Sequence, residues 1–182
     1  MKTRRVILFL ISVLMILSSA GCGSAKSASP ESVVKSYFEA LKQSDFETAS
    51  KYIDDEAAEF SNNENDEQTK EIVAKLIENL DYTISSSEKD GDTATVKATI
   101  KNISFSDVMT DFVGEAMTLA FSGLSEDEMD SKFMEILSSC FDKNKDNIVE
   151  NDVDIKLEKT ENGWIIISDN SLTNAILGGM LS

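Results

Sequence analysis

The stretch that follows Ser29 constrains the fold of this chain more than any other part of the sequence. Ser29 and Pro30 mark a helix start, because a serine hydroxyl accepts from first-turn amides and proline lacks the amide that would be unpaired there. Five apolar side chains then recur at i, i+1, i+4, i+5 and i+8 on one helical face: Val33, Val34, Tyr37, Phe38 and Leu41. This stripe predicts a helix buried along one side, which a sheet or further helices must cover.

Two more helices are predicted before the pattern changes. Ser44 with Glu47 three residues later has the spacing of a capping box, which predicts that a short second helix starts at Ser44. The apolar residues of this second helix are Phe46, Ala49, Tyr52 and Ile53. A third helix is predicted over about 66–80, where the spacing of the first helix returns in Ile72, Val73, Leu76, Ile77 and Leu80.

From Tyr82 onwards the apolar period becomes two, which is typical of strands with one buried face. Two strands are joined at Asp90-Gly91 and two more at Asn162-Gly163, and both dipeptides are typical of hairpin turns. The sequence therefore predicts four antiparallel strands in two hairpins.

The segments between and after the hairpins have helical periodicity. Between the hairpins, apolar residues form two such segments, and Ser125 with Glu128 has capping-box spacing at the start of the second. A final short helix is expected over about 171–177, before two glycines. Together these elements predict an α+β fold: N-terminal helices on a four-stranded antiparallel sheet, a two-helix insert between the hairpins, and a C-terminal helix.

The opening helices resemble those of a known superfamily. The residues that carry the resemblance are the run 33–41 (VVKSYFEAL), then Asp45, then 52–55 (YIDD). They resemble the start of nuclear-transport-factor-2-like (cystatin-like) domains, which implies a cone-shaped sheet curved around the first helix. The whole chain is similar to small lipoproteins of Gram-positive bacteria that carry such a domain and have no assigned activity.

The amino terminus has the features of a lipoprotein leader. Three basic residues precede an apolar run over 6–17, which is too short to span a bilayer and typical of a signal-peptide core. Residues 17–22 (LSSAGC) resemble a bacterial lipobox, in which the cysteine receives a diacylglycerol group and becomes the first mature residue. One departure is Ser19, where leucine is usual. The alternative is an ordinary secreted protein or an uncleaved signal anchor.

These features predict three parts: a signal peptide over 1–21, a lipidated N-terminus and spacer over 22–28, and one domain over 29–182. Lipid attachment is expected at Cys22, on the outer face of the bacterial cytoplasmic membrane. With Cys22 acylated, Cys140 cannot form a disulfide within the chain. Because Cys140 falls on the apolar face of a predicted helix, we expect a small buried side chain there, the alternative being a reactive thiol.

Charge and composition restrict the partners. Removing residues 1–21 removes three basic groups, so 14 basic and 33 acidic residues remain, a net charge of −19. Such a surface is repelled by nucleic acid and by anionic lipid, and leaves cations, basic peptides or neutral ligands. The simpler explanation is that the charge keeps an exported domain soluble. The chain contains no histidine, which excludes serine–histidine and cysteine–histidine nucleophiles.

Tyr37 is the position at which the resemblance implies chemistry. It matches the oxyanion-hole tyrosine of ketosteroid isomerase, a member of the same superfamily, and such chemistry also needs a carboxylate base. Counting places that base at Ser61, and the neighbouring Glu59 is out of step. We therefore predict no catalytic residues and no cofactor, with Tyr37 lining the core or a cavity.

Two further groups of residues are weaker candidates. Asp142, Asn144 and Asp146 have the spacing of the first half of an EF-hand loop, but Asn147 stands where glycine belongs and Val153 where a bidentate glutamate belongs. We predict no metal site and a polar loop that caps the helix. Aromatic and methionine residues could line an apolar pocket or simply form core: Tyr37, Phe112, Met117, Phe121, Met129, Phe133, Met134 and Trp164.

The sequence as a whole predicts a non-catalytic module of the cell envelope, anchored through lipid, that binds a small apolar ligand or another protein and no nucleic acid. One alternative is a small enzyme of the isomerase or dehydratase type, which requires a deep cavity where Tyr37 faces a carboxylate. Another is a structural subunit of an envelope complex, which requires an apolar surface on the insert helices.

Overall fold

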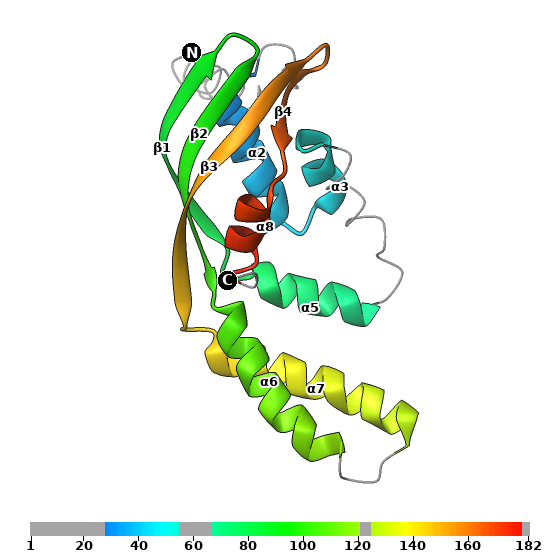
Figure 1. Ribbon diagram of the computed structural model, residues 1–182. Coiled ribbons are helices and arrows are strands. Elements are labelled where there is room, and N and C mark those ends of the chain that lie inside the picture. Colours follow the sequence, from blue (N-terminus) through cyan, green and yellow to red (C-terminus); the bar gives the residue numbers. More distant parts are fainter. Residues whose placement is uncertain (1–27, 55–66, 121–124, 180–182) are drawn as a thin grey trace, which may run out of the picture.

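The computed structural model describes residues 28–54, 67–120 and 125–179, and it confirms the predicted α+β fold (Figure 1). The elements are, in order, α2 (Pro30–Lys42), α3 (Phe46–Ala49), the 3-10 turn η2 (Ser50–Tyr52), α5 (Glu67–Ile77), β1 (Asp81–Asp90), β2 (Thr93–Ile103), α6 (Phe105–Ala120), α7 (Glu126–Asn144), β3 (Ile148–Thr160), β4 (Gly163–Ile167) and α8 (Asn170–Ile176). Each predicted helix and strand is present, with ends shifted by a few residues.

The four strands form one antiparallel sheet in the order β1-β2-β3-β4. Gly91 turns the chain between β1 and β2 with a φ of 62°, which glycine adopts without strain. Strand β2 pairs with β3 along its whole length, up to Ile103 opposite Ile148. The two insert helices therefore leave and re-enter the sheet at neighbouring residues.

One face of the sheet is buried and the other is open to solvent. The buried face alternates along β2 and β3, as the period of two predicts, and includes Ala94, Val96, Ala98, Ile100, Val153, Ile155 and Leu157. Helices α2 and α8 cover this face, so the core lies between them and the sheet. Cross-strand pairs on the open face, such as Lys101 with Glu150 at 2.6 Å, keep it polar.

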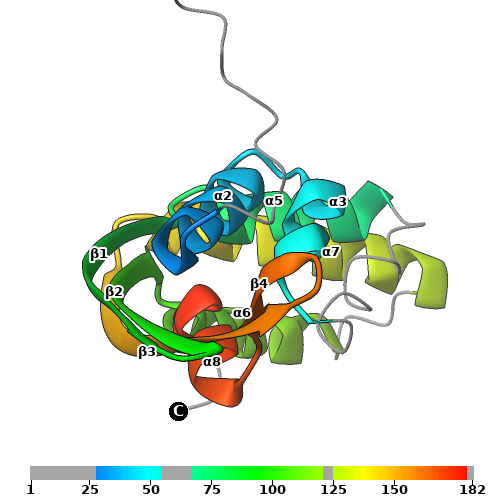
Figure 2. The ribbon, with the colours of Figure 1, turned by 90° about the horizontal axis from the view of Figure 1, so that it is seen from above.

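Helix α2 starts as predicted and occupies the centre of this core. The Ser29 hydroxyl accepts from the Ser32 amide at 3.2 Å, and Val34 and Phe38 are fully buried. The sheet curls around α2 (Figure 2). The Lys89 Nζ on edge strand β1 lies 5.8 Å from the ring centre of Trp164 on the other edge strand, β4.

The predicted cap of the second helix is wrong by one residue. Asp45 is the cap, and its carboxylate accepts from the Thr48 amide at 3.0 Å. Ser44 has a φ of 56° and donates its amide to Leu41, so it closes the end of α2 instead. The helix is also shorter than expected, because Ile53 has already entered a β-bridge with Ile166.

The two insert helices form a hairpin that projects beyond the end of the sheet (Figure 1). We call residues 105–144 with their connection the α6–α7 hairpin. A second, smaller core joins its base to the sheet and to α5: Leu76, Ile103, Val108, Cys140 and Phe141. Cys140 is buried as predicted, and burial raises the pKa of its thiol. The predicted pair at the start of α7 is also present, since the Ser125 amide donates to Glu128 at 3.1 Å.

Across the part of the chain that the structure describes, no helix combines the length and the apolar character that crossing a bilayer requires. The predicted leader and Cys22 lie outside the described residues.

Candidate functional site

The structure does not bring the predicted pocket residues together in one place. Tyr37 and Trp164 belong to the core between α2 and the sheet. Phe112 and Phe133 pair between α6 and α7, with ring centres 6.1 Å apart. Met117 lies on the outside of α6 with 61% of its surface exposed. Phe121 lies outside the described residues.

Tyr37 is buried, and among the described residues the carboxylate of Asp54 affects the pKa of its hydroxyl. Burial, and then the negative charge of Asp54, raise the pKa of the Tyr37 hydroxyl far above its usual value, so the side chain stays neutral. The Asp54 carboxylate accepts from the Ser168 amide at 3.4 Å, at the edge of β4. The base position implied by the resemblance, Ser61 and the nearby Glu59, lies outside the described residues.

The three EF-hand-like residues do not converge on one point. Helix α7 continues through Asn144, so Asp142 is helical and forms an ion pair with Lys75 at 2.7 Å. Both polar atoms of the Asn144 amide are engaged, as described below. Asp142 and Asp146 instead line a polar hollow of about 350 Å³ between α5 and α7, together with Lys75 and Lys145. Among the described residues, no three histidine, cysteine or acidic side chains are grouped to hold a metal.

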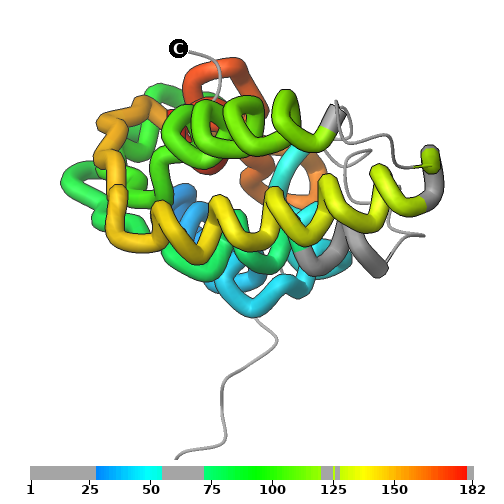
Figure 3. Tube along the Cα trace, turned by 90° about the horizontal axis from the view of Figure 1, so that it is seen from below, coloured from blue at the N-terminus to red at the C-terminus, as the bar shows by residue number. Residues whose placement is uncertain are grey.

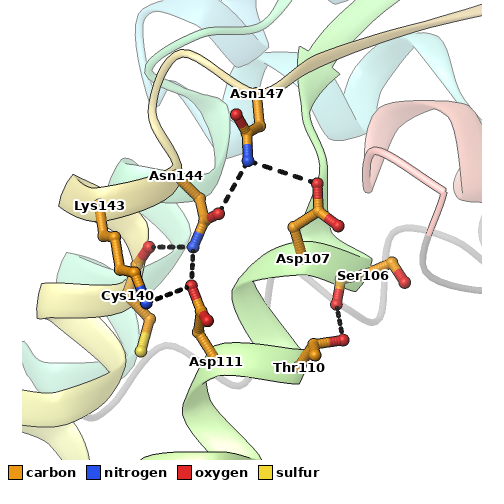
Figure 4. A network of polar contacts seen from close by, with 8 residues as sticks. All are labelled: Ser106, Asp107, Thr110, Asp111, Cys140, Lys143, Asn144 and Asn147. Atoms are coloured by element: carbon orange, nitrogen blue, oxygen red, sulfur yellow. Dashed lines mark hydrogen bonds and ion pairs between the residues drawn. The ribbon is translucent and has the colours of Figure 1, made fainter.

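A polar network fixes the base of the α6–α7 hairpin (Figure 4). The buried Asn144 amide nitrogen donates to the Asp111 carboxylate at 2.8 Å and to the Cys140 carbonyl at 3.0 Å. Its carbonyl oxygen accepts from the Asn147 amide at 2.9 Å, and Lys143 pairs with Asp111 at 3.0 Å. The hydrogen bond from Asn144 contributes most, and the one from Lys143 next, to a pKa of the Asp111 carboxylate below its usual value. The network joins the end of α7 to the first turns of α6.

Sequence reasoning assigned Asn144 to a possible metal loop and missed this role. The available signal was the pair Asp107 and Asp111, four residues apart on a helix whose apolar face points elsewhere. Nothing in the spacing shows that Asn144, 33 residues away, lies opposite Asp111. Only the packing of α6 on α7 brings them together.

The most exposed apolar surface in the described chain lies on the outer side of α6. Val113 is 50% exposed and Met117 61%, one turn apart, and Met109 and Ala116 on the same side are half-buried. We call these four residues the α6 open face. Helix α6 packs mainly against α7 (Figure 3), which covers the side of α6 that carries Phe112. Sequence reasoning named Met117 as a pocket residue, but it could not tell which part of a wide apolar stripe stays uncovered.

Comparisons with known proteins place the chain in a family without assigning an activity. A family model described as a domain of unknown function (DUF5105) matches residues 25–180. A similar solved structure is that of YcdA from Bacillus subtilis subsp. subtilis str. 168, described as a "putative lipoprotein", with 17% sequence identity and a TM-score of 0.47. That likeness covers 83% of this chain and 47% of YcdA, so the chain spans about half the length of YcdA. None of the curated proteins matches the sequence.

Proposed function

Because the chain belongs to the DUF5105 family, whose function is unknown, we propose a function from its own residues. We propose that it is a lipid-anchored protein on the outer face of the bacterial cytoplasmic membrane. Its domain binds another protein through the α6 open face and carries out no catalysis. The curl of the sheet around α2 supports a nuclear-transport-factor-2-like arrangement as part of this proposal.

The anchor is supported by the sequence before the fold. A basic and apolar leader ends at Cys22, in the lipobox-like run 17–22. Helix α2 begins eight residues later at Pro30, so the spacer reaches at most roughly 30 Å when extended. Two acyl chains on Cys22 give stable attachment.

The α6 open face is the observation that carries the binding role. An apolar surface on a projecting helix has no part in the folded core, and exposed apolar patches with polar surroundings mark interaction sites. A small apolar ligand has less support, because the side chains between α2 and the sheet, such as Phe38 and Ile155, are almost fully buried by one another. A partner protein is therefore the better proposal of the two.

Catalysis also has little support. Tyr37 is held neutral near Asp54, but both belong to the region of the filled core, and the described hollows are lined by other residues. An isomerase-like enzyme remains the alternative. It predicts that Tyr37→Phe abolishes turnover of a cyclic ketone without changing stability, whereas the binding role predicts no turnover in either protein.

Site-specific cross-linking in living cells tests the binding role. A photo-reactive phenylalanine analogue is placed at Met117, and the matched control carries it at the exposed Glu88 on β1. We expect a discrete adduct from position 117 that Val113→Ser removes, and none from position 88. Absence of an adduct at 117, or equal adducts at both positions, would contradict the proposal.

Replacing the anchor cysteine tests the location. We expect Cys22→Ala to release the protein into the medium or leave its leader uncleaved, because no thioether can form. Membrane fractionation and incorporation of a labelled fatty acid measure the effect, with Cys140→Ala as the control that keeps both. Normal processing and membrane retention of Cys22→Ala would refute lipidation.

A further inference from the structure

We propose that the protein bound by the α6 open face is a second copy of this chain, so that two α6 helices pack together with Val113 of each copy near the two-fold axis. This inference rests on the proposed function and names its partner. Four observations carry it: the spacing of the face, its lack of charge, its position relative to the anchor, and its area.

The apolar residues of the α6 open face have the spacing of a seam between two helices. Met109, Val113 and Ala116 fall at i, i+4 and i+7, the alternation of four and three residues with which paired helices interdigitate their side chains. Val113 lies near the middle of the 16-residue helix and is half exposed, because α7 covers the side of α6 that carries Phe112. A second copy supplies the helix that this spacing predicts.

The acidic residues of α6 lie away from this face, so two copies can meet there without strong repulsion. Asp107, Asp111 and Glu115 are on the side towards α7, where Asp111 bonds Asn144 and Lys143. In two helices packed with their axes 8–10 Å apart, carboxylates on the far sides are separated by roughly 20 Å. That is more than twice the Debye length of about 8 Å at physiological ionic strength, so the repulsion is largely screened.

The surface beside the face is also uncharged and is built from small residues. Ser106, Thr110 and Gly114 recur at i, i+4 and i+8 next to Val113 and Met117. No described atom lies within 4 Å of the place where a side chain on Gly114 would start, so another backbone can approach closely. A basic or acidic partner finds no ion pair on this surface, whereas a second copy requires none.

The proposed anchor holds two copies so that their faces can meet. Lys42 at the end of α2 pairs with Asp81 at the start of β1, and the hairpin leaves the sheet at this end. Helix α2 begins at the other end of the molecule (Figure 1), so the spacer from Cys22 reaches the domain far from the hairpin. Two copies anchored in one membrane hold their α6 faces at the same height, and confinement to the membrane raises their effective concentration.

The size of the face shows why the anchor matters. Helix α6 is ~24 Å long and a helix is about 10–12 Å wide, so two faces together cover roughly 500 Å². Stable complexes between freely diffusing proteins bury about 1,200 Å² or more. The contact is therefore weak between free copies, and its test uses the full lipid-anchored chain in cells.

Disulfide trapping at the axis tests the proposal. Val113→Cys is compared with the control Glu88→Cys on β1, since both positions are exposed, and copper phenanthroline is the oxidant. Two cysteines near a two-fold axis come within bonding reach, so we expect a reducible product of twice the chain mass, at least tenfold more abundant from position 113. Cys140 is buried and gives no background.

Opposite charges at position 113 test whether the two faces meet. Val113→Lys or Val113→Glu expressed alone places like charges at the axis, so we expect each to lower the doubled-mass photo-adduct from position 117 at least fivefold. Co-expression of the two variants with different tags should restore at least half of that adduct as a mixed pair, which also shows that both variants fold. Glu88→Gln makes the same charge change as Val113→Lys and should alter the adduct less than twofold.

Three results would overturn the proposal: equal trapping from positions 113 and 88, a doubled-mass adduct that neither charged variant reduces, or no recovery when the two variants are co-expressed. The mass of the photo-adduct from position 117 separates this inference from the proposed function. If that adduct contains a different protein, the proposed function stands and this inference falls. If no adduct forms at position 117, both fall.

Discussion

The fold leaves no room for a side chain at Gly178. Its carbonyl accepts from the Phe105 amide at 3.2 Å, which connects the end of α8 to the first residue of α6. It has a φ of 61°, and a Cβ there would lie 1.8 Å from the carbonyl oxygen of Ile103. Glycine is therefore required both for the backbone conformation and for the close approach.

Gly91 and Gly178 have nearly the same φ, so a comparison of the two distinguishes the effect of backbone conformation from that of the close approach. Gly91, with a φ of 62°, has no atom within 4 Å of an added Cβ. We expect Gly91→Ala to lower the free energy of unfolding by about 1–2 kcal/mol through backbone strain alone. Gly178→Ala should lower it by roughly 3 kcal/mol or more, because the Ile103 backbone must also move. Urea titrations of the two variants measure the difference, and equal losses would show that the close approach is unimportant.

Asp111 predicts a pH dependence of stability. Its folded-state pKa is lowered by Asn144 and Lys143, so its contribution is present above the unfolded pKa of about 3.9 and is lost as the pH falls through the lower folded value. We expect Asp111→Asn to be less stable than the wild type at pH 7. The difference should shrink below about pH 4, as measured by urea unfolding.

The variant Asn144→Ala tests the cause of this pH dependence. It removes a buried side-chain amide that donates to the Asp111 carboxylate and to the Cys140 carbonyl, so we expect a loss of about 1–3 kcal/mol at pH 7. It should also remove most of the Asp111 pH dependence, because Asn144 is the largest cause of the lowered pKa. An unchanged pH profile would assign that dependence to Lys143.

At the scale of elements, the junction of α2 and α3 shows what a sequence pattern resolves. The pattern correctly predicts that the chain breaks between two helices near Ser44. It cannot decide which polar residue caps the second helix, because Ser44 and Asp45 are both good caps. The φ of 56° at Ser44 decides it: that residue completes the turn that ends α2, so Asp45 is left to begin α3.

Ser44→Gly tests this assignment. Because glycine adopts a positive φ without strain, we expect the substitution to raise the free energy of unfolding by up to about 1 kcal/mol. Ser50→Gly is the control: Ser50 has a φ of −60° in the helical region, so there the loss of backbone entropy should lower stability by roughly 0.5–1 kcal/mol. If Ser44 were the cap, Ser44→Gly would be slightly destabilising.

The helices and strands were predictable because each has a clear apolar period, as with Val33 to Leu41 on α2 and Val153 to Leu157 on β3. The candidate site was only partly predictable. The period shows that α6 is apolar over a wide arc that includes both Phe112 and Met117, but α7 covers the first and not the second. Which side is covered depends on contacts between residues distant in sequence, which periodicity does not contain.

At the scale of the whole molecule, the described chain has two cores of unequal size. The larger lies between α2, α8 and the sheet, and the smaller joins the α6–α7 hairpin and α5 to the sheet end. The hairpin enters after Ile103 and returns at Ile148, which are direct partners in the β2–β3 register. The sheet therefore needs no hairpin residue to complete its strand pairing.

Replacing residues 104–147 by a short glycine-containing turn tests the independence of the larger core. We expect the shortened chain to fold with a strand signal close to that of the wild type, a smaller helical signal and one cooperative unfolding transition. Its free energy of unfolding should be lower because the second core is lost. Circular dichroism during urea unfolding measures this, and a gradual, non-cooperative transition would show that the hairpin is needed for the fold.

The pairing of Ile103 with Ile148 has a consequence for how such a protein diversifies. Because the two ends of the helical insert are adjacent, helices of other lengths and sequences can replace it while the strand register is retained. The binding surface can then change by replacement of one contiguous segment, while the rest of the domain keeps its structure.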